Sequence, residues 1–163
     1  MLKIVLWGLV VIVAAGGIAF VTIGRERSWE LIAGPPGLEP YDFNANLRSP
    51  NPNDALACSP GLCQKPDFEI APMHDAPPIA IERLSQRLLA SDPLARRVDD
   101  RKDPAKARFV TYSPFFRFPD VIHLEARPLQ DGRTGVMAYA RAQLGKSDLG
   151  KNRARLEALF AGP

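Results

Sequence analysis

The residues most able to do chemistry lie in the second half of the chain. Ser147 and Asp148 open the string SDLGKNRARLEALF, and His123 precedes them. Serine, histidine and aspartate are the residue types of a hydrolytic triad, but types without geometry are weak evidence for catalysis. The chain contains no G-x-S-x-G, P-loop or G-x-G-x-x-G motif. We therefore expect no enzyme, with a hydrolase-like enzyme of unrecognised type as the lesser alternative.

Metal and cofactor chemistry finds little support in the sequence. His74 and His123, the only histidines, have no spacing typical of a zinc site. Asp99, Asp100 and Asp103 lie beside Arg101 and Lys102, a pattern more typical of a solvated charged loop. We expect neither a metal site nor a cofactor.

The binding of an anion is the chemistry that the arginines favour. Between residues 122 and 143, large or polar side chains alternate with small apolar ones, as in a strand with two unlike faces. Arginine and tyrosine on one such face suit an anion or a lipid headgroup, although the face can also simply be solvated. Asp148 either caps the last helix or orients an arginine. The candidate ligand-binding residues are His123, Arg127, Tyr139, Arg141, Asp148, Asn152 and Arg153.

A β-hairpin must position the residues of this face. The apolar set of residues 122–126 and the small apolar set of residues 136–140 pair correctly only across a three-residue loop, Gln130-Asp131-Gly132. That loop places Gly132 in the left-handed conformation and His123 opposite Tyr139. The apolar face of the hairpin is then free to pack under helices.

Two helices and a further strand complete the predicted domain. Residues 79–91 carry apolar side chains at helical spacing, and residues 147–160 form a second helix with Leu149, Leu156, Leu159 and Phe160 on its apolar side. Residues 107–116 are rich in β-branched and aromatic side chains, and prolines limit that strand to an edge or end it. The predicted fold class is α+β: an N-terminal single transmembrane helix, a Pro-rich irregular arm, and a small antiparallel sheet packed against two helices.

The first segment of the chain predicts membrane attachment. Residues 4–23 carry no charge, and about 20 apolar residues cross a hydrocarbon core of about 30 Å. We expect an uncleaved anchor, with a cleaved signal peptide as the alternative. Lys3 on one side and Arg25 and Arg27 on the other leave the orientation nearly balanced.

Two cysteines decide the predicted orientation. Cys58 and Cys63 enclose Ser-Pro-Gly-Leu, a strong turn signal, so a disulfide is favoured over free thiols and over metal or redox chemistry. Disulfides persist in oxidising compartments. We therefore expect a single-pass protein of the inner membrane whose C-terminal domain lies in the periplasm or an equivalent lumen.

Charge and proline content divide the chain into three parts: residues 1–27 with the anchor, a Pro-rich acidic arm at 28–78, and a small basic α+β domain at 79–163. Residues 35–78 hold 10 of the 16 prolines and have six acidic against two basic residues. Residues 79–163 have 16 basic and 10 acidic residues, a net charge of +6. The acidic arm either lies over the basic surface or is solvated independently of it.

Three strings resemble the domain-of-unknown-function family 1499. They are NDALACSPGLC, FRFPDVIHLEARPL and YARAQLGKSDLGKNRARLEALF, and members of the family typically show R-F-P-D and a closing string like S-R-L-G-x-S-D-x-G-x-N-R-x-R. The chain matches the closing string at Gly145, Ser147, Asp148, Gly150, Asn152, Arg153 and Arg155. It departs at Ala140, Ala142 and Gln143, where relatives often carry Ser, Ser and Arg. The resemblance implies membrane association in the envelope or a lumen and no established activity.

These observations predict a membrane-anchored, non-enzymatic envelope domain that binds an anionic ligand, a lipid headgroup or an envelope component. The alternative is an accessory subunit of a larger membrane protein complex. The expected partners are the lipid membrane and either such subunits or an anionic ligand. Nucleic acid is not expected, because the basic domain is predicted to lie outside the cytoplasm.

Overall fold

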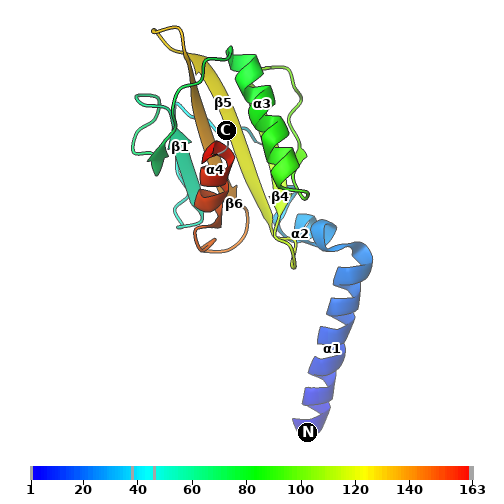
Figure 1. Cartoon of the computed structure of the whole chain (residues 1–163). Coiled ribbons are helices and arrows are strands. Elements are labelled where there is room, and N and C mark those ends of the chain that lie inside the picture. The colour runs from blue at the N-terminus through cyan, green and yellow to red at the C-terminus, as the bar shows by residue number, and fades with distance from the viewer. Residues whose placement is uncertain (1, 38, 46, 162–163) are drawn as a thin grey trace.

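The computed structural model describes residues 2–37, 39–45 and 47–161. A long helix, α1 (Leu2–Ile23), extends away from the rest of the chain and is followed by the short helix α2 (Arg25–Ala33) (Figure 1). The domain then contains β1 (Asp54–Cys58), β2 (Phe68–Glu69), α3 (Pro77–Ser91), β3 (Arg96–Arg97), β4 (Lys106–Tyr112), β5 (Pro119–Pro128), β6 (Thr134–Ala142) and α4 (Lys151–Ala161). The predicted α+β class is confirmed.

The described strands form one sheet in the order β2-β1-β6-β5-β4-β3. All neighbours are antiparallel except β1 and β2, which are parallel. The predicted hairpin register is confirmed, because Leu124 pairs with Ala138 and His123 with Tyr139. Its loop is also as predicted, with Gly132 at φ 79°.

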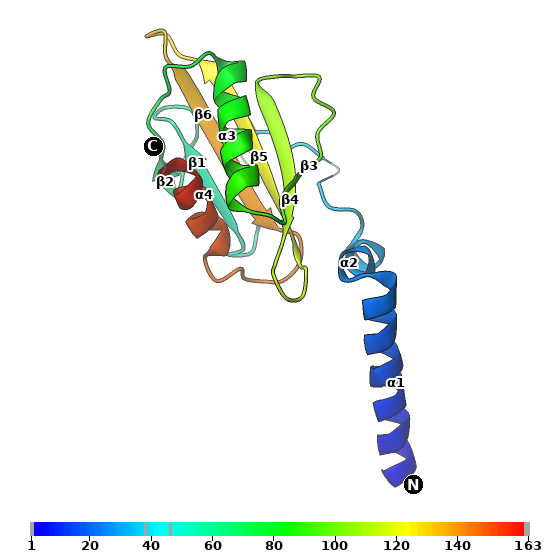
Figure 2. The same cartoon turned by 45° about the vertical axis from the view of Figure 1, so that its right-hand side comes forward.

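One face of the sheet lies under α3 and α4 (Figure 2). Small alanines on β1 and β6 leave room for Leu84 and Leu88 of α3 and for Leu156 of α4, all of which are fully buried. The prediction that Leu149 belongs to the apolar side of the last helix is wrong. Leu149 is 87% exposed, because the helix begins only at Lys151 and Leu149 lies in the turn before it.

The arm covers the opposite face of the sheet. Phe43 packs with Leu56, Met137 and Tyr139 in a second buried cluster, so of the two alternatives for the arm the structure shows contact with the sheet. The prediction of an irregular arm over residues 28–78 is wrong for residues 28–33, which belong to α2, for residues 54–58, which form β1, and for residues 68–69, which form β2. Ala55 and Ala57 face the helix layer, while Leu56 and Cys58 face the arm.

Helix α1 is long and apolar enough to cross a membrane. It has 22 residues, and none of them is buried within the protein. At about 1.5 Å per residue it spans about 33 Å, close to the thickness of a hydrocarbon core. A signal sequence near an N-terminus has the same length and composition. Gly24, at φ 97°, separates α1 from α2.

Candidate functional site

His123 and Tyr139 lie opposite each other on the sheet and directly under the arm. The backbone N–H of Tyr41 donates to His123 Nδ1 at 3.2 Å, and the Tyr41 ring stacks on Tyr139 with 3.9 Å between ring centroids. Tyr139 is only 3% exposed. The arm therefore occupies the part of this face that the sequence assigned to a ligand.

His123 is a neutral acceptor in this setting. Burial, together with the positive charges of Arg108 and Arg141, lowers the pKa of His123 to about 3. Because Nδ1 accepts the Tyr41 N–H, the ring proton is placed on Nε2. His123 thus helps to hold the arm and carries no charge for an anion at neutral pH.

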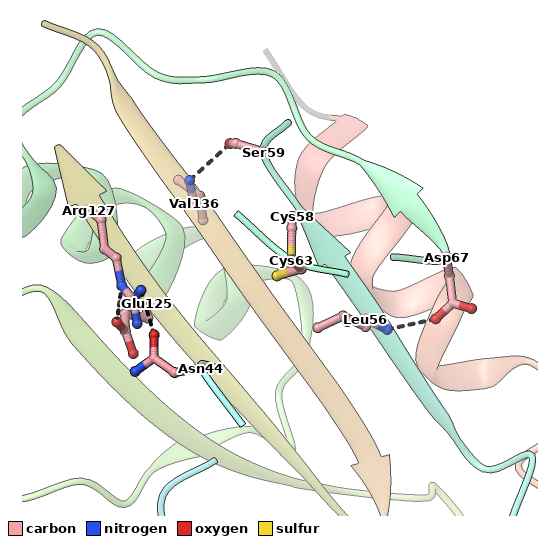
Figure 3. Close-up of a disulfide and its surroundings, with 9 residues drawn as sticks. All are labelled: Asn44, Leu56, Cys58, Ser59, Cys63, Asp67, Glu125, Arg127 and Val136. Carbon is pink, nitrogen blue, oxygen red and sulfur yellow. Dashed lines mark hydrogen bonds and ion pairs between the residues drawn. A yellow bond between two sulfur atoms is a disulfide. The ribbon is translucent and has the colours of Figure 1, made fainter. Parts of the chain in front are cut away.

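Arg127 is neutralised within the protein. Its Nε donates to Glu125 at 2.6 Å, and its Nη1 donates to Asn44 of the arm at 2.9 Å (Figure 3). Glu125 is buried and also lies 3.4 Å from Lys106 Nζ. A buried carboxylate needs such partners. The donors of Arg127 are therefore used within the protein and in the contact with the arm, and not for a ligand.

Arg141 differs from the other candidates on this face. It is exposed, and among the described residues no ion pair to it is found. Its partner in register is Asp54, but the guanidinium of Arg48 holds that carboxylate with two bonds of 2.8 and 2.9 Å. Burial alone would raise the pKa of Asp54, but Arg48 and the Ser49 N–H lower it below the usual value.

Two adjoining hollows flank Arg141. The first, about 280 Å³, lies between the sheet and the arm, with His123, Tyr139 and Gln143 in its wall. The second, about 430 Å³, is lined by Asn51, Asn53 and Lys146. Gln143 Nε2 donates to the carbonyls of Ala33 and Gly34 at the end of α2, so these hollows lie at the end of the sheet nearest the membrane helix.

The C-terminal string begins with a helix cap. Asp148 accepts the N–H groups of Gly150 at 3.0 Å and Asn152 at 2.9 Å, which satisfies donors at the start of α4. Ser147 Oγ accepts the Leu149 N–H at 3.2 Å. The capping alternative is therefore confirmed for Asp148, and no bond to an arginine side chain is found for it within the described residues.

Asn152 and Arg155 connect α4 to three other segments. Asn152 is fully buried and donates to the Asn53 carbonyl at 3.4 Å. Arg155 Nη1 donates to Asn152 Oδ1 at 2.7 Å and to Asp120 Oδ2 at 2.9 Å, and its Nε lies 3.8 Å from Asp92. Burial raises the pKa of Asp120, although Arg155 opposes the shift. These bonds make a buried polar network under the helices.

The sequence candidates therefore form two separate groups. His123, Arg127, Tyr139 and Arg141 lie on the arm side of the sheet, whereas Asp148, Asn152 and Arg153 lie at or near α4. Arg153 forms an exposed pair with Glu157 at 2.8 Å. Asp92, Asp120 and Arg155 belong to the buried network and were not among the sequence candidates, although R-F-P-D contains Asp120 and N-R-x-R contains Arg155.

The disulfide predicted from the sequence is confirmed. Cys58 at the end of β1 bonds Cys63, with 6.0 Å between their Cα atoms (Figure 3). Ser59 reinforces the same corner, since its Oγ accepts the Val136 N–H at 2.9 Å. Among the described residues, no group of three or more His, Cys, Asp or Glu is arranged to hold a metal.

Removal of the disulfide should lower stability measurably. The free energy of unfolding of the double variant Cys58→Ser/Cys63→Ser is expected to be about 2 kcal/mol lower than that of the wild type, because the bond restricts the unfolded chain. The effect is modest because the closed loop is short. Urea denaturation of the full chain in detergent micelles measures the loss. Adding a reductant should weaken the wild type to the same extent and leave the variant unchanged. Equal midpoints for the oxidised wild type and the variant would contradict the prediction.

The protein is therefore a disulfide-bonded α+β domain that follows a helix able to cross a membrane. Its arm covers one face of the sheet. A family model described as "Protein of unknown function (DUF1499)" matches residues 41–162. The chain belongs to that family, and the matched region includes Tyr41 and Phe43 of the arm. Comparisons with curated proteins and with solved structures gave no match.

Proposed function

We propose that this protein is a membrane-anchored, non-enzymatic envelope domain that binds an anionic ligand at Arg141. The observation that carries the proposal is the exposed guanidinium between two hollows, with its partner in register already bound by Arg48. Arg127 and Arg155 are held in internal ion pairs. Of the two candidate arginines on this sheet face, Arg127 and Arg141, Arg141 is the one that is exposed and has no ion pair among the described residues.

The location in the proposal rests on two features. Helix α1 has the length and composition of an anchor, and the disulfide is typical of oxidising compartments. Together they support α1 as an uncleaved anchor of the cytoplasmic membrane, with the domain on the periplasmic side.

The surroundings of Arg141 suit a small anion such as a phosphate or carboxylate group. Lys146 lines the second hollow together with Asn51, whose amide can donate without adding negative charge, whereas the Asn53 amide already donates to the carbonyls of Ala142 and Gly145. Among the residues that line these two hollows, only Glu39 is a carboxylate. An arginine fork binds a planar or tetrahedral oxyanion through two parallel hydrogen bonds.

Loss of the Arg141 charge is expected to abolish most of this binding. In calorimetric titrations of the full chain in a neutral detergent, we expect sn-glycerol 3-phosphate, inorganic phosphate or acetate to bind the wild type. Arg141→Gln should bind about tenfold more weakly, as expected for one charged hydrogen bond.

Arg133→Gln is the matched control, because Arg133 is also an exposed arginine but lies in the distant hairpin loop before β6, where it is paired with Asp131 at 2.6 Å. It should bind as the wild type does. The proposal is overturned if none of the three anions binds, or if Arg141→Gln and the wild type bind alike. A protein that co-purifies with the wild type and is lost from Arg141→Gln would favour the accessory-subunit alternative.

A further inference from the structure

The loop between β4 and β5 exposes phenylalanines beside the membrane helix. Phe115 is 73% exposed, Phe116 52% and Phe118 38%. In both views the loop reaches toward α2 at the junction with α1 (Figures 1 and 2). Adjacent exposed aromatic rings on a domain surface mark a contact site more often than a solvated loop.

Hydrogen bonds and ring contacts hold this loop against the chain that leaves α1. Arg25 Nη1 donates to the Phe115 carbonyl at 2.6 Å, and Trp29 Nε1 donates to the Phe116 carbonyl at 2.7 Å. The Trp29 ring lies 5.4 Å from that of Phe20 in α1 and 4.7 Å from that of Phe118. The loop is therefore fixed at the level where α1 ends.

The loop is also rigid in its own right. Ser113 accepts the Phe118 N–H through its Oγ at 2.9 Å, and its backbone N–H donates to the Phe118 carbonyl at 2.9 Å. These bonds close the turn at its base and add to the bonds that Arg25 and Trp29 make to the loop.

The length of α1 sets the depth of the loop in a bilayer. A helix of about 33 Å brings Ile23 to the edge of a hydrocarbon core of about 30 Å, and Arg25 then lies among the headgroups. Because the Phe115 carbonyl accepts from Arg25, Phe115 and Phe116 lie at the same boundary. Tryptophan is enriched at this level of a bilayer, and phenylalanines of interfacial segments enter the boundary between headgroups and acyl chains.

A groove of about 820 Å³ runs between α1 and the loop. Its lower wall is apolar, with Gly17, Phe20 and Val21 of α1, and its rim carries Arg25, Arg27 and Arg117 together with Glu26. Arg117 Nη1 is buried, and no acceptor for it is found among the described residues. Arg117 lines the groove and has no ion pair among the described residues, so its guanidinium charge is not neutralised by a carboxylate of the domain and suits a phosphate at the rim.

We propose that this surface is a second membrane contact: Phe115 and Phe116 enter the leaflet from which α1 emerges, and the groove holds an anionic phospholipid whose phosphate is bound by Arg117. The apolar wall beneath a basic rim matches the order of acyl chain and headgroup in a lipid. The contact rests on α1 being the membrane anchor of the proposed function, but it is separate from Arg141, so a failure of anion binding at Arg141 leaves it standing.

The insertion of the loop can be tested by spin labelling of the full chain in vesicles of phosphatidylcholine and phosphatidylglycerol. Cys58 and Cys63 are bonded to each other, so Phe115→Cys provides the reactive thiol. Its nitroxide should be accessible to oxygen and protected from a water-soluble nickel complex. Gln130→Cys, at an exposed position in the hairpin loop at the opposite end of β5, is the matched control and should show the opposite pattern. Equal nickel accessibility at both positions overturns the insertion.

The bound lipid can be tested by native mass spectrometry of the full chain in detergent with added phosphatidylglycerol or phosphatidylcholine. The wild type should retain phosphatidylglycerol in preference, and Arg117→Gln should lower its retention about tenfold. Arg133→Gln should retain the lipid as the wild type does. Unchanged retention in Arg117→Gln, or equal retention of the two lipids by the wild type, overturns the lipid site.

Discussion

Arg155→Met is expected to destabilise the domain by about 3 kcal/mol, measured by urea denaturation of the full chain in detergent micelles. The variant keeps the apolar stem and removes the charge, which leaves Asp120 Oδ2 and the side-chain Oδ1 of Asn152 without their donor at 2.9 and 2.7 Å. Removing one partner of a largely buried ion pair costs about 3–5 kcal/mol, because the other charge stays buried without compensation. Asp120 is only 8% exposed, so water cannot replace the guanidinium.

Arg153→Met is the matched control for this prediction. It lies on the same helix, and its pair with Glu157 is exposed on both sides. Exposed pairs contribute about 0–1 kcal/mol, so Arg153→Met should be nearly neutral. Similar losses for the two variants would mean that the Arg155 network contributes no more than a surface pair.

Acid should destabilise the wild type through His123 by about 2–3 kcal/mol between pH 6.5 and pH 4.5. The pKa of His123 is about 3 in the folded protein and about 6.5 in an unfolded chain. Between these values the unfolded chain binds a proton and the folded chain does not, so stability falls as the pH decreases. A proton on Nδ1 would also occupy the atom that accepts the Tyr41 N–H.

His123→Gln removes the titrating group and keeps a side-chain acceptor for Tyr41. Arginine partners lower the pKa values of Asp54 and Asp99 despite burial. Protonation of these carboxylates in acid therefore lowers the stability of both proteins. The difference between the two pH profiles of the urea midpoint therefore isolates His123. Parallel profiles for wild type and variant between pH 6.5 and pH 4.5 would contradict a depressed pKa.

The hairpin could be predicted from the sequence because two independent signals agree. Alternation of side chains defines the faces of residues 122–126 and 136–140, and the Gly132 turn defines the register. Strand β1 lacked both signals. It has only five residues, three of which are not strand-favouring, and it lies in a proline-rich segment. Its place in the sheet comes from packing on both faces, which a local pattern does not contain.

Some features of the candidate site could likewise be predicted from the sequence, and others could not. The pairing of Arg127 with Glu125 follows from their positions two residues apart on one strand face, and the Asp148 cap follows from its place before an apolar helix. The network of Asp92, Asp120 and Arg155 joins the end of α3, the start of β5 and the middle of α4. Only the tertiary fold brings these segments together.

The attachment of α2 to the domain has a mechanical consequence. The chain leads from α2 to the sheet through the arm, but α2 is also bound directly to the far edge of the sheet: Glu26 and Glu30 pair with Arg96 at 3.4 and 3.3 Å, and Arg96 bonds the Tyr112 hydroxyl. A pull along α1 therefore reaches the sheet by two routes, through these side-chain contacts to β3 and β4 and through the chain to the arm. The contacts of Tyr41 with His123 and Tyr139 then carry only part of the force that movement of the anchor produces.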